Sequence, residues 1–148
     1  MLAESERHFL IVRRVGHLAT AGSDAAPHVV PVCFAISDGT LYITVDEKPK
    51  RAPGAKLKRV RNIEQNPNVA FVVDRYDEDW TLLGWVMLRG PAEILAGGTE
   101  HDEAQVLLRS RYPQLAAMRI SALPVIAVRI ERVTSWGNLS APEAREPV

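Results

Sequence analysis

The most concentrated chemistry in this sequence is positive charge. All four lysines of the chain fall within eleven residues, interleaved with three arginines: Lys48, Lys50, Lys56, Lys58, Arg51, Arg59 and Arg61. Seven of the 18 basic residues therefore lie between positions 48 and 61, although the formal net charge of the chain is zero. Because cations held this close repel one another, a bound anion such as a phosphate is the natural explanation of the cluster. A solvated basic loop is the alternative explanation.

A helix predicted at 56–65 positions part of this cluster. Its apolar residues recur every three positions and form the stripe that faces the core: Leu57, Val60 and Ile63. At 100° per residue, Arg59 and Asn62 share one flank of the helix, so we expect them to reach one ligand together. Lys48 or Lys50 would approach that ligand from the end of the preceding strand. Neither a Walker pattern nor a dinucleotide glycine fingerprint is present, so this phosphate site is predicted from geometry alone.

The other residue types that serve catalysis or metal binding show no productive spacing. The four histidines share no helix face and have no clear third ligand: His8, His17, His28 and His101. Cys33 is the one cysteine, and beside Phe34 it is interpreted as a small core hydrophobe. The acidic run 77–79 lacks the glycine and the spaced oxygens of a calcium loop, and is interpreted as a solvated loop or as partners for arginines across a dimer. The sequence therefore predicts no catalytic side chain and no metal site.

Length and composition predict one globular domain, residues 1–148, with a flexible tail at 140–148. The apolar runs are too short to span a bilayer, and the start of the chain does not resemble a secretory signal, so we expect a cytoplasmic protein that does not bind membranes. The pI near 6.9 gives no overall attraction to nucleic acid, and the basic cluster contains no aromatic residue on which bases could stack. We therefore expect no nucleic-acid partner.

The elements that must position these residues are six strands and three helices. The strands are predicted at 17–21, 27–36, 41–45, 69–74, 85–95 and 125–133, and the helices at 2–14, 56–65 and from Thr99, as N-cap, to 111. Their order, mostly hairpins, predicts a mainly β protein, a closed antiparallel barrel with appended helices. Pro31 places its strand at an edge or a bulge. The apolar run 69–74 predicts burial on both faces.

A series of short segments then resembles a known family: residues 17–21, 27–34, 41–44, 47–51, 57–59, 61–63 and 66–70. In this order they resemble the pyridoxamine 5′-phosphate oxidase-like split-barrel family of flavin and deazaflavin proteins. The run Asp-Arg-Tyr-Asp-Glu-Asp-Trp at 74–80, with Leu83, Trp85 and Gly90, resembles more narrowly its PPOX-class oxidoreductase branch, which depends on the deazaflavin coenzyme F-420. The resemblance extends over about residues 13–136.

The resemblance implies a six-stranded antiparallel split β-barrel of the FMN-binding type, paired into a homodimer with two cofactor sites at the subunit interface. The residues that would hold the cofactor phosphate are Lys48, Lys50, Lys58 and Arg59, with Asn62 beside them. The ring would lie against the backbone near Val32 and Thr44, and Trp85 would stack on it. Trp80, Trp85 and Trp136 would anchor the dimer. Gly84 replaces an expected aromatic residue, which predicts open space beside Trp85.

The function implied by the resemblance is transfer of a hydride between coenzyme F-420 and a small organic substrate. Two alternatives stay open at this point. One is an FMN-dependent flavoprotein like pyridoxamine-phosphate oxidase, and the other is a protein that binds a flavin or deazaflavin without catalysis. The sequence does not determine the substrate, the direction of hydride transfer or the role of Lys56.

Overall fold

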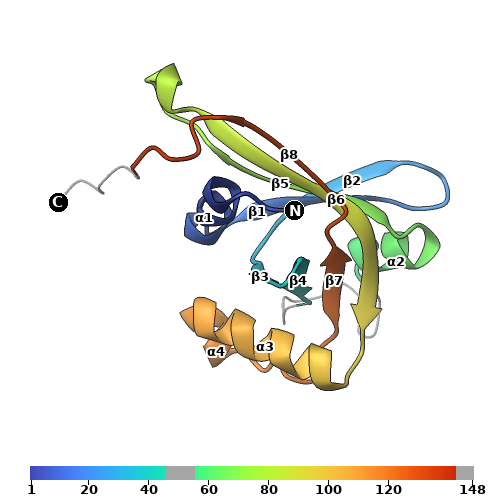
Figure 1. Cartoon of the computed structure of the whole chain (residues 1–148). Helices are drawn as coiled ribbons and strands as arrows, with labels where there is room; N and C mark the ends of the chain where they lie inside the picture. The colour runs from blue at the N-terminus through green and yellow to red at the C-terminus, as the bar shows by residue number, and fades with distance from the viewer. Residues whose placement is uncertain (46–55, 143–148) are drawn as a thin grey trace.

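The computed structural model describes residues 1–45 and 56–142, and in these ranges the chain forms eight strands with helices at their connections (Figure 1). The elements in chain order are α1 (Glu4–Val12), β1 (Gly16–Ala21), β2 (Pro27–Val32), β3 (Ala35–Ser37), β4 (Thr40–Thr44), α2 (Lys58–Gln65), β5 (Asn68–Arg75), the 3-10 turn η1 (Trp80–Leu82), β6 (Gly84–Leu95), α3 (Thr99–Arg111), α4 (Pro113–Ala117), β7 (Val125–Arg129) and β8 (Arg132–Gly137).

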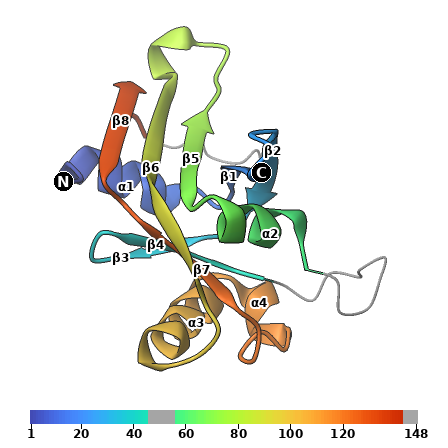
Figure 2. The same cartoon turned by 90° about the vertical axis from the view of Figure 1, so that its right-hand side faces the viewer.

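All strand pairs are antiparallel, in the order β2-β1-β5-β6-β7-β4-β3, with β8 paired to β6. The two ends of this order, β2 and β3, follow each other directly in the chain, so the sheet curves back on itself as a split barrel. Figure 2 shows the two halves: β5, β6 and β8 rise on one side, while α3 and α4 cover β3, β4 and β7 on the other. The mainly β split-barrel fold expected from the sequence is confirmed.

The long strand β6 joins the two halves. Its first part pairs with β5 and β8, and residues 92–95 pair with β7. The chain between β7 and β8 crosses β6 at Gly90, where an added Cβ would lie 1.8 Å from the carbonyl oxygen of Arg129. Since no side chain fits at that distance, glycine at position 90 permits the two halves to meet.

The strand count differs from the six expected because two predicted strands are divided. The stretch 27–36 breaks at Cys33 and Phe34, where the hydroxyl of Tyr112 accepts the Phe34 N–H at 3.0 Å and lies 2.9 Å from the Phe34 carbonyl oxygen. A side chain thus takes the place of a ladder partner. The stretch 125–133 breaks at Ile130 and Glu131, whose N–H groups bond to Gly39 and Arg89 instead of continuing one ladder.

Three smaller expectations about the elements can also be compared with the structure. Pro31 lies on β2, which is an edge strand, as predicted. The N-cap of α3 is Gly98 and not Thr99. Helix α4 was not predicted: Pro113 stops α3, but its fixed φ and missing N–H suit the first turn of a new helix, which it starts.

The core consists of two clusters, one enclosed by the sheet and α1 and one between the sheet and α3. In the first, the rings of Phe34 and Phe71 meet edge to face at 5.0 Å. The prediction that 69–74 is buried on both faces was wrong. Burial alternates along β5, since Val69, Phe71 and Val73 are buried while Ala70 and Val72 are half-exposed. This second side of β1, β5, β6 and β8 is called the outer face below.

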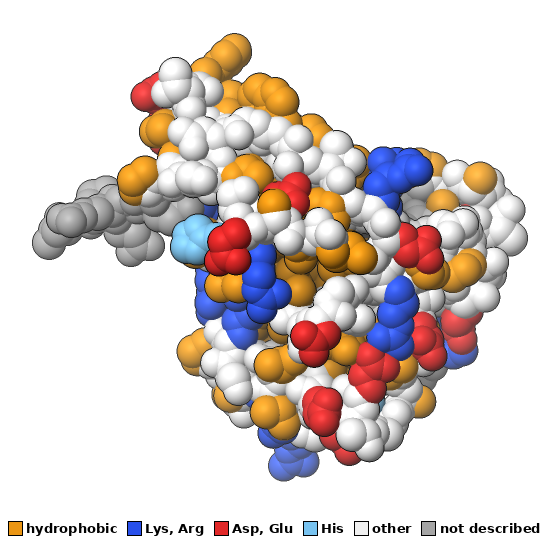
Figure 3. Space-filling model, viewed as in Figure 1, with side chains coloured by type: hydrophobic (Ala, Val, Ile, Leu, Met, Phe, Trp, Pro, Cys, Tyr) orange, Lys and Arg blue, Asp and Glu red, His pale blue; other side chains and the backbone are white. Residues whose placement is uncertain are grey.

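A group of ion pairs lies at the start of α3. Arg129 of β7 bonds to Glu93 at 2.8 Å and to Glu100 at 2.5 Å and 2.9 Å, and the hydroxyl of Tyr42 donates to Glu100 at 2.7 Å. These bonds, those from Arg129 first, lower the pKa of Glu100 to about 2, and burial raises the pKa of Tyr42 to about 12. Figure 3 shows acidic and basic side chains side by side over α3 and the end of β6. No helix within the described ranges is long and apolar enough to cross a bilayer.

Candidate functional site

A cavity of about 220 Å³ lies at the carboxyl ends of β2 and β4, next to the start of α2. It is lined by Val15, Pro31, Val32, Cys33, Thr44, Arg59 and Leu115, and is called the β2–β4 cavity below. Three residues predicted to contact a cofactor, Val32, Thr44 and Arg59, thus lie around one space. The lining combines one guanidinium and one hydroxyl with mainly apolar walls, which suits a ligand that carries an anion on an apolar body.

Arg59 reaches this cavity from the first turn of α2. The predicted stripe is confirmed for this helix, since Val60 and Ile63 are buried and Leu57 is half-buried. The first turn contains cations and no acidic residue, and no side chain caps it. Because the N-terminus of a helix carries a partial positive charge, cations there are unfavourable unless an anion lies close by. Arg59 therefore lies where a phosphate group would be favoured.

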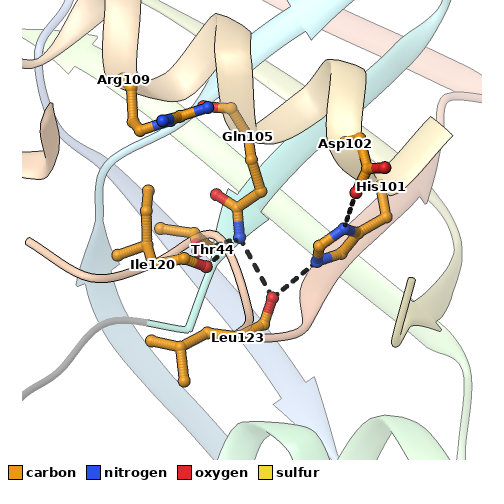
Figure 4. Close-up of polar contacts among 7 residues, drawn as sticks. All are labelled: Thr44, His101, Asp102, Gln105, Arg109, Ile120 and Leu123. Carbon is orange, nitrogen blue, oxygen red and sulfur yellow. Dashed lines mark hydrogen bonds and ion pairs between the residues drawn. The ribbon is translucent and has the colours of Figure 1, made fainter. Parts of the chain in front are cut away.

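Thr44 is held at the end of β4 by a buried amide on α3 (Figure 4). The side-chain N–H₂ of Gln105 lies 3.0 Å from the Thr44 hydroxyl, 2.8 Å from the carbonyl of Ile120 and 3.1 Å from that of Leu123. Gln105 is almost completely buried, and its own Oε1 has no hydrogen-bond partner within the part of the chain described. The amide therefore fixes one wall of the cavity.

His101 supports the same network one turn earlier on α3. Its Nε2 lies 2.7 Å from the Leu123 carbonyl, which Gln105 also contacts, and its Nδ1 lies 2.9 Å from a carboxylate oxygen of Asp102 (Figure 4). Both ring nitrogens face acceptors, so the doubly protonated ring is favoured. The bond to the Leu123 carbonyl, with help from Asp102, raises the pKa of His101 above its ordinary value.

The other wall, around Val32 and Cys33, is held by the end of α3. The hydroxyl of Tyr112 bonds to the backbone of Phe34, as described above, and Arg111 Nε donates to the same hydroxyl at 3.0 Å. Because α3 thus holds both walls, the β2–β4 cavity depends on contacts between segments far apart in the chain.

The remaining predicted cofactor residues lie elsewhere or outside the described ranges. Asn62 is buried and donates from Nδ2 to the Thr20 hydroxyl at 3.0 Å, so it faces β1 and does not line the cavity with Arg59. Lys58 is exposed on the first turn of α2. Lys48 and Lys50 lie outside the described residues. A role of these four side chains in binding a cofactor stays a prediction.

Trp85 lies away from the β2–β4 cavity, on the outer face. It borders a depression of about 490 Å³ together with His17, Val72, Asp74 and Met87. Pro31 of the β2–β4 cavity pairs directly with His17 of this depression, so the two spaces flank one strand pair. Stacking of Trp85 on a cofactor ring stays a prediction.

Two expectations about neighbouring residues can now be answered. The open space predicted at Gly84 is absent, because a Cβ there would already lie 3.2 Å from both the Asn138 carbonyl oxygen and the Leu139 side chain. The chain directly after β8 fills that position. Lys56, whose role was open, pairs with Glu64 on α2 at 2.8 Å and not with the cavity.

Sequence reasoning missed the residues that complete or support the cavity. Leu115 comes from the unpredicted helix α4, and Gln105 supports Thr44 from 61 residues away. A glutamine at a helix position that faces the core is a signal of a buried polar contact, but it does not name the partner. Within the described ranges, no three His, Cys, Asp or Glu side chains gather as a possible metal site.

Comparison with known proteins places the chain among related sequences and structures. Residues 2–137 match the family described as pyridoxamine 5′-phosphate oxidase. A 5a,11a-dehydrotetracycline/5a,11a-dehydrooxytetracycline reductase of Streptomyces rimosus subsp. rimosus is 31% identical over 137 residues, which are 90% of this chain and 82% of that protein. An FAD-binding protein of Mesorhizobium loti has a TM-score of 0.67 and 27% identity, over 90% of this chain and 92% of its own. An F420 reductase has a TM-score of 0.64 and 25% identity, over 90% and 98%.

Proposed function

Because the chain belongs to the pyridoxamine 5′-phosphate oxidase family, we propose that it is an oxidoreductase that transfers a hydride between coenzyme F-420 and a small organic substrate. The observation that carries this proposal is the β2–β4 cavity, which gathers Val32, Thr44 and Arg59. A reductase among the relatives and an F420 reductase among the similar structures support the reaction class and the choice of a deazaflavin over FMN.

The residues around the cavity fit the phosphate-bearing part of such a cofactor. The guanidinium of Arg59 would hold the phosphate by charge-assisted hydrogen bonds, with Lys58 in the same helical turn. Val15, Val32 and Leu115 exclude water from the adjoining walls. When bound, a deazaflavin supplies the carbon that accepts or donates the hydride, so the protein's task is to bind, orient and keep out water. This division fits a site without an evident acid–base pair.

The cavity that the described residues enclose is smaller than the usual site for a whole cofactor. Ligand sites for molecules of this kind usually measure about 300–1,000 Å³, and the β2–β4 cavity measures about 220 Å³. We therefore expect the rest of the cofactor to lie against another surface. We propose that a second copy of the chain supplies it, in a twofold dimer.

The aromatic end of the outer face is the surface that would contact this second copy. The hairpin between β5 and β6 projects from the body in Figure 1, and it carries Tyr76 and Trp80, which are 64% and 71% exposed. Trp136 pairs with Trp85 on the adjacent strand and is 53% exposed. Exposed aromatic side chains in one region are typical anchors of protein interfaces. Light scattering should give twice the mass of one chain, and a monomer at micromolar concentration would refute this assembly.

A titration with F-420 and with FMN tests the choice of cofactor. We expect F-420 to bind more tightly, and tight FMN binding with no F-420 binding would replace F-420 by FMN in the proposal. A second measurement separates an enzyme from a binding protein. The related reductase acts on a dehydrotetracycline, so a conjugated ring compound of that kind is the first substrate to test. An enzyme oxidises reduced F-420 when this substrate is added, whereas a carrier leaves its absorbance unchanged.

A further inference from the structure

We propose that the outer face carries a second ligand site, at the end opposite the aromatic hairpin, which binds a small organic molecule through a carboxylate or phosphate group. A depression of about 570 Å³ lies there, with Arg89 of β6 and Arg132 of β8 at its border. It shares no lining residue with the β2–β4 cavity. The proposal therefore stands independently of the cofactor assignment.

The two arginines face each other, and no carboxylate among the described residues forms an ion pair with either of them. Arg89 and Arg132 are directly paired in the register of β6 and β8, so their side chains emerge on the same face. Both are exposed, and neither side chain makes a hydrogen bond or ion pair with another described residue. Like charges placed directly opposite one another on a sheet are destabilising. A bound oxyanion would remove that repulsion.

Arg129, three residues before Arg132, shows what a structural arginine looks like in this protein. Its guanidinium bonds to Glu93 and Glu100, two carboxylates on separate elements. The depression at Arg89 and Arg132 offers only one carboxylate, that of Glu131, against two guanidinium groups. The lining therefore keeps one net positive charge, which favours an anion.

The rest of the depression suits the apolar body of a small molecule. Its floor is formed by small side chains, Ala19, Ala21 and Ala70, and an additional polar group is supplied by Asn68. The hydroxyl of Thr20, which also borders it, is already bonded to Asn62. A volume of about 570 Å³ falls within the usual range of about 300–1,000 Å³ for small-molecule sites. The fork of a guanidinium group can bind two oxygens of a carboxylate or of a phosphate at once.

Amide chemical shifts of the full chain, titrated with phenyl phosphate, benzoate and inorganic phosphate, test this site. We expect phenyl phosphate or benzoate to shift the amides around Ala19, Ala70 and Arg89. We expect the organic anion that binds to do so more tightly than inorganic phosphate, because only an organic anion has a ring that can contact the alanine side chains of the depression. The comparison of the two organic anions tells a phosphate site from a carboxylate site. Shifts confined to the surroundings of Arg59 would assign the anion to the β2–β4 cavity and overturn the proposal.

Variants separate a binding role from a structural one. Arg89→Ala and Arg132→Ala should each weaken binding of the organic anion about tenfold or more. Arg89→Lys keeps the charge but loses the planar fork, so its affinity should lie between that of the parent chain and that of Arg89→Ala. Arg7→Ala, which removes the same charge from an exposed position on α1, is the matched control and should bind normally. The two alanine variants should be as stable to urea as the parent chain without ligand, since they remove a repulsion. Normal binding in both alanine variants would refute the site. Dissociation of the dimer in these variants, together with no anion binding by the parent chain, would also refute it, because the arginines would then serve the subunit contact.

Discussion

Replacing Arg59 with alanine removes the guanidinium that lines the β2–β4 cavity and leaves its apolar walls in place. If Arg59 holds the cofactor phosphate, the lost charge-assisted contact is worth about 1.5–3 kcal/mol. Each 1.4 kcal/mol is a factor of ten in affinity, so the dissociation constant for F-420 should rise about 10- to 150-fold. The unfolding free energy should change little, because a partly exposed cation in a cationic first turn adds little to helix stability.

The assay is an equilibrium titration of the Arg59→Ala variant with F-420, followed by urea unfolding of the same sample without ligand. Arg61→Ala is the matched control, because it removes the same charge from an exposed position of the same helix. Arg61→Ala should lower affinity only slightly, through the long-range field, and that small loss should vanish in high salt.

Two results would refute the reasoning. Unchanged affinity in Arg59→Ala would show that the cavity does not hold the phosphate. An equal loss of affinity in Arg59→Ala and Arg61→Ala would show that the cluster attracts anions only by its summed charge, as a solvated basic loop would.

Three further predictions concern the contacts that build the cavity and its fold. Gly90→Ala places a methyl group 1.8 Å from a carbonyl oxygen, so urea unfolding should show a loss of about 2 kcal/mol or more. Tyr112→Phe removes the hydroxyl that replaces a ladder partner at Phe34; it should cost about 1–3 kcal/mol by the same measurement, and an unchanged midpoint would contradict the assigned role. The folded-state pKa of His101 is raised, so its stabilising effect is fully present below about pH 6.5 and is lost as the pH rises through the raised value. Unfolding free energies of the parent chain and of His101→Gln, measured from pH 5.5 to 9, should therefore converge as the pH rises, whereas the exposed His8→Gln serves as control.

Most of the local structure follows from the sequence, because it depends on neighbours within one turn or one hairpin. The stripe of Leu57, Val60 and Ile63 defines the buried side of α2. Asp38 and Gly39 are residue types typical of a hairpin turn, and they join β3 to β4. The resemblance to the family led to the mainly β split barrel and to the three residues that the cavity gathers. The buried stripe and the turn follow from periodicity and turn chemistry, which can be read in one sequence, whereas the split barrel and the cavity residues came from the resemblance.

The tertiary structure decided which of these local features meet, because each such contact joins segments that no local pattern connects. Asn62 turned inward since Thr20, 42 residues earlier, offers a buried acceptor, and the strand at 27–36 divided since Tyr112, 78 residues later, binds the backbone of Phe34. The space expected at Gly84 is filled by the chain after β8, and the second side of β5 stays open because no helix within the described ranges covers it. Periodicity states that a face is apolar, but only the packing of distant segments determines what covers it.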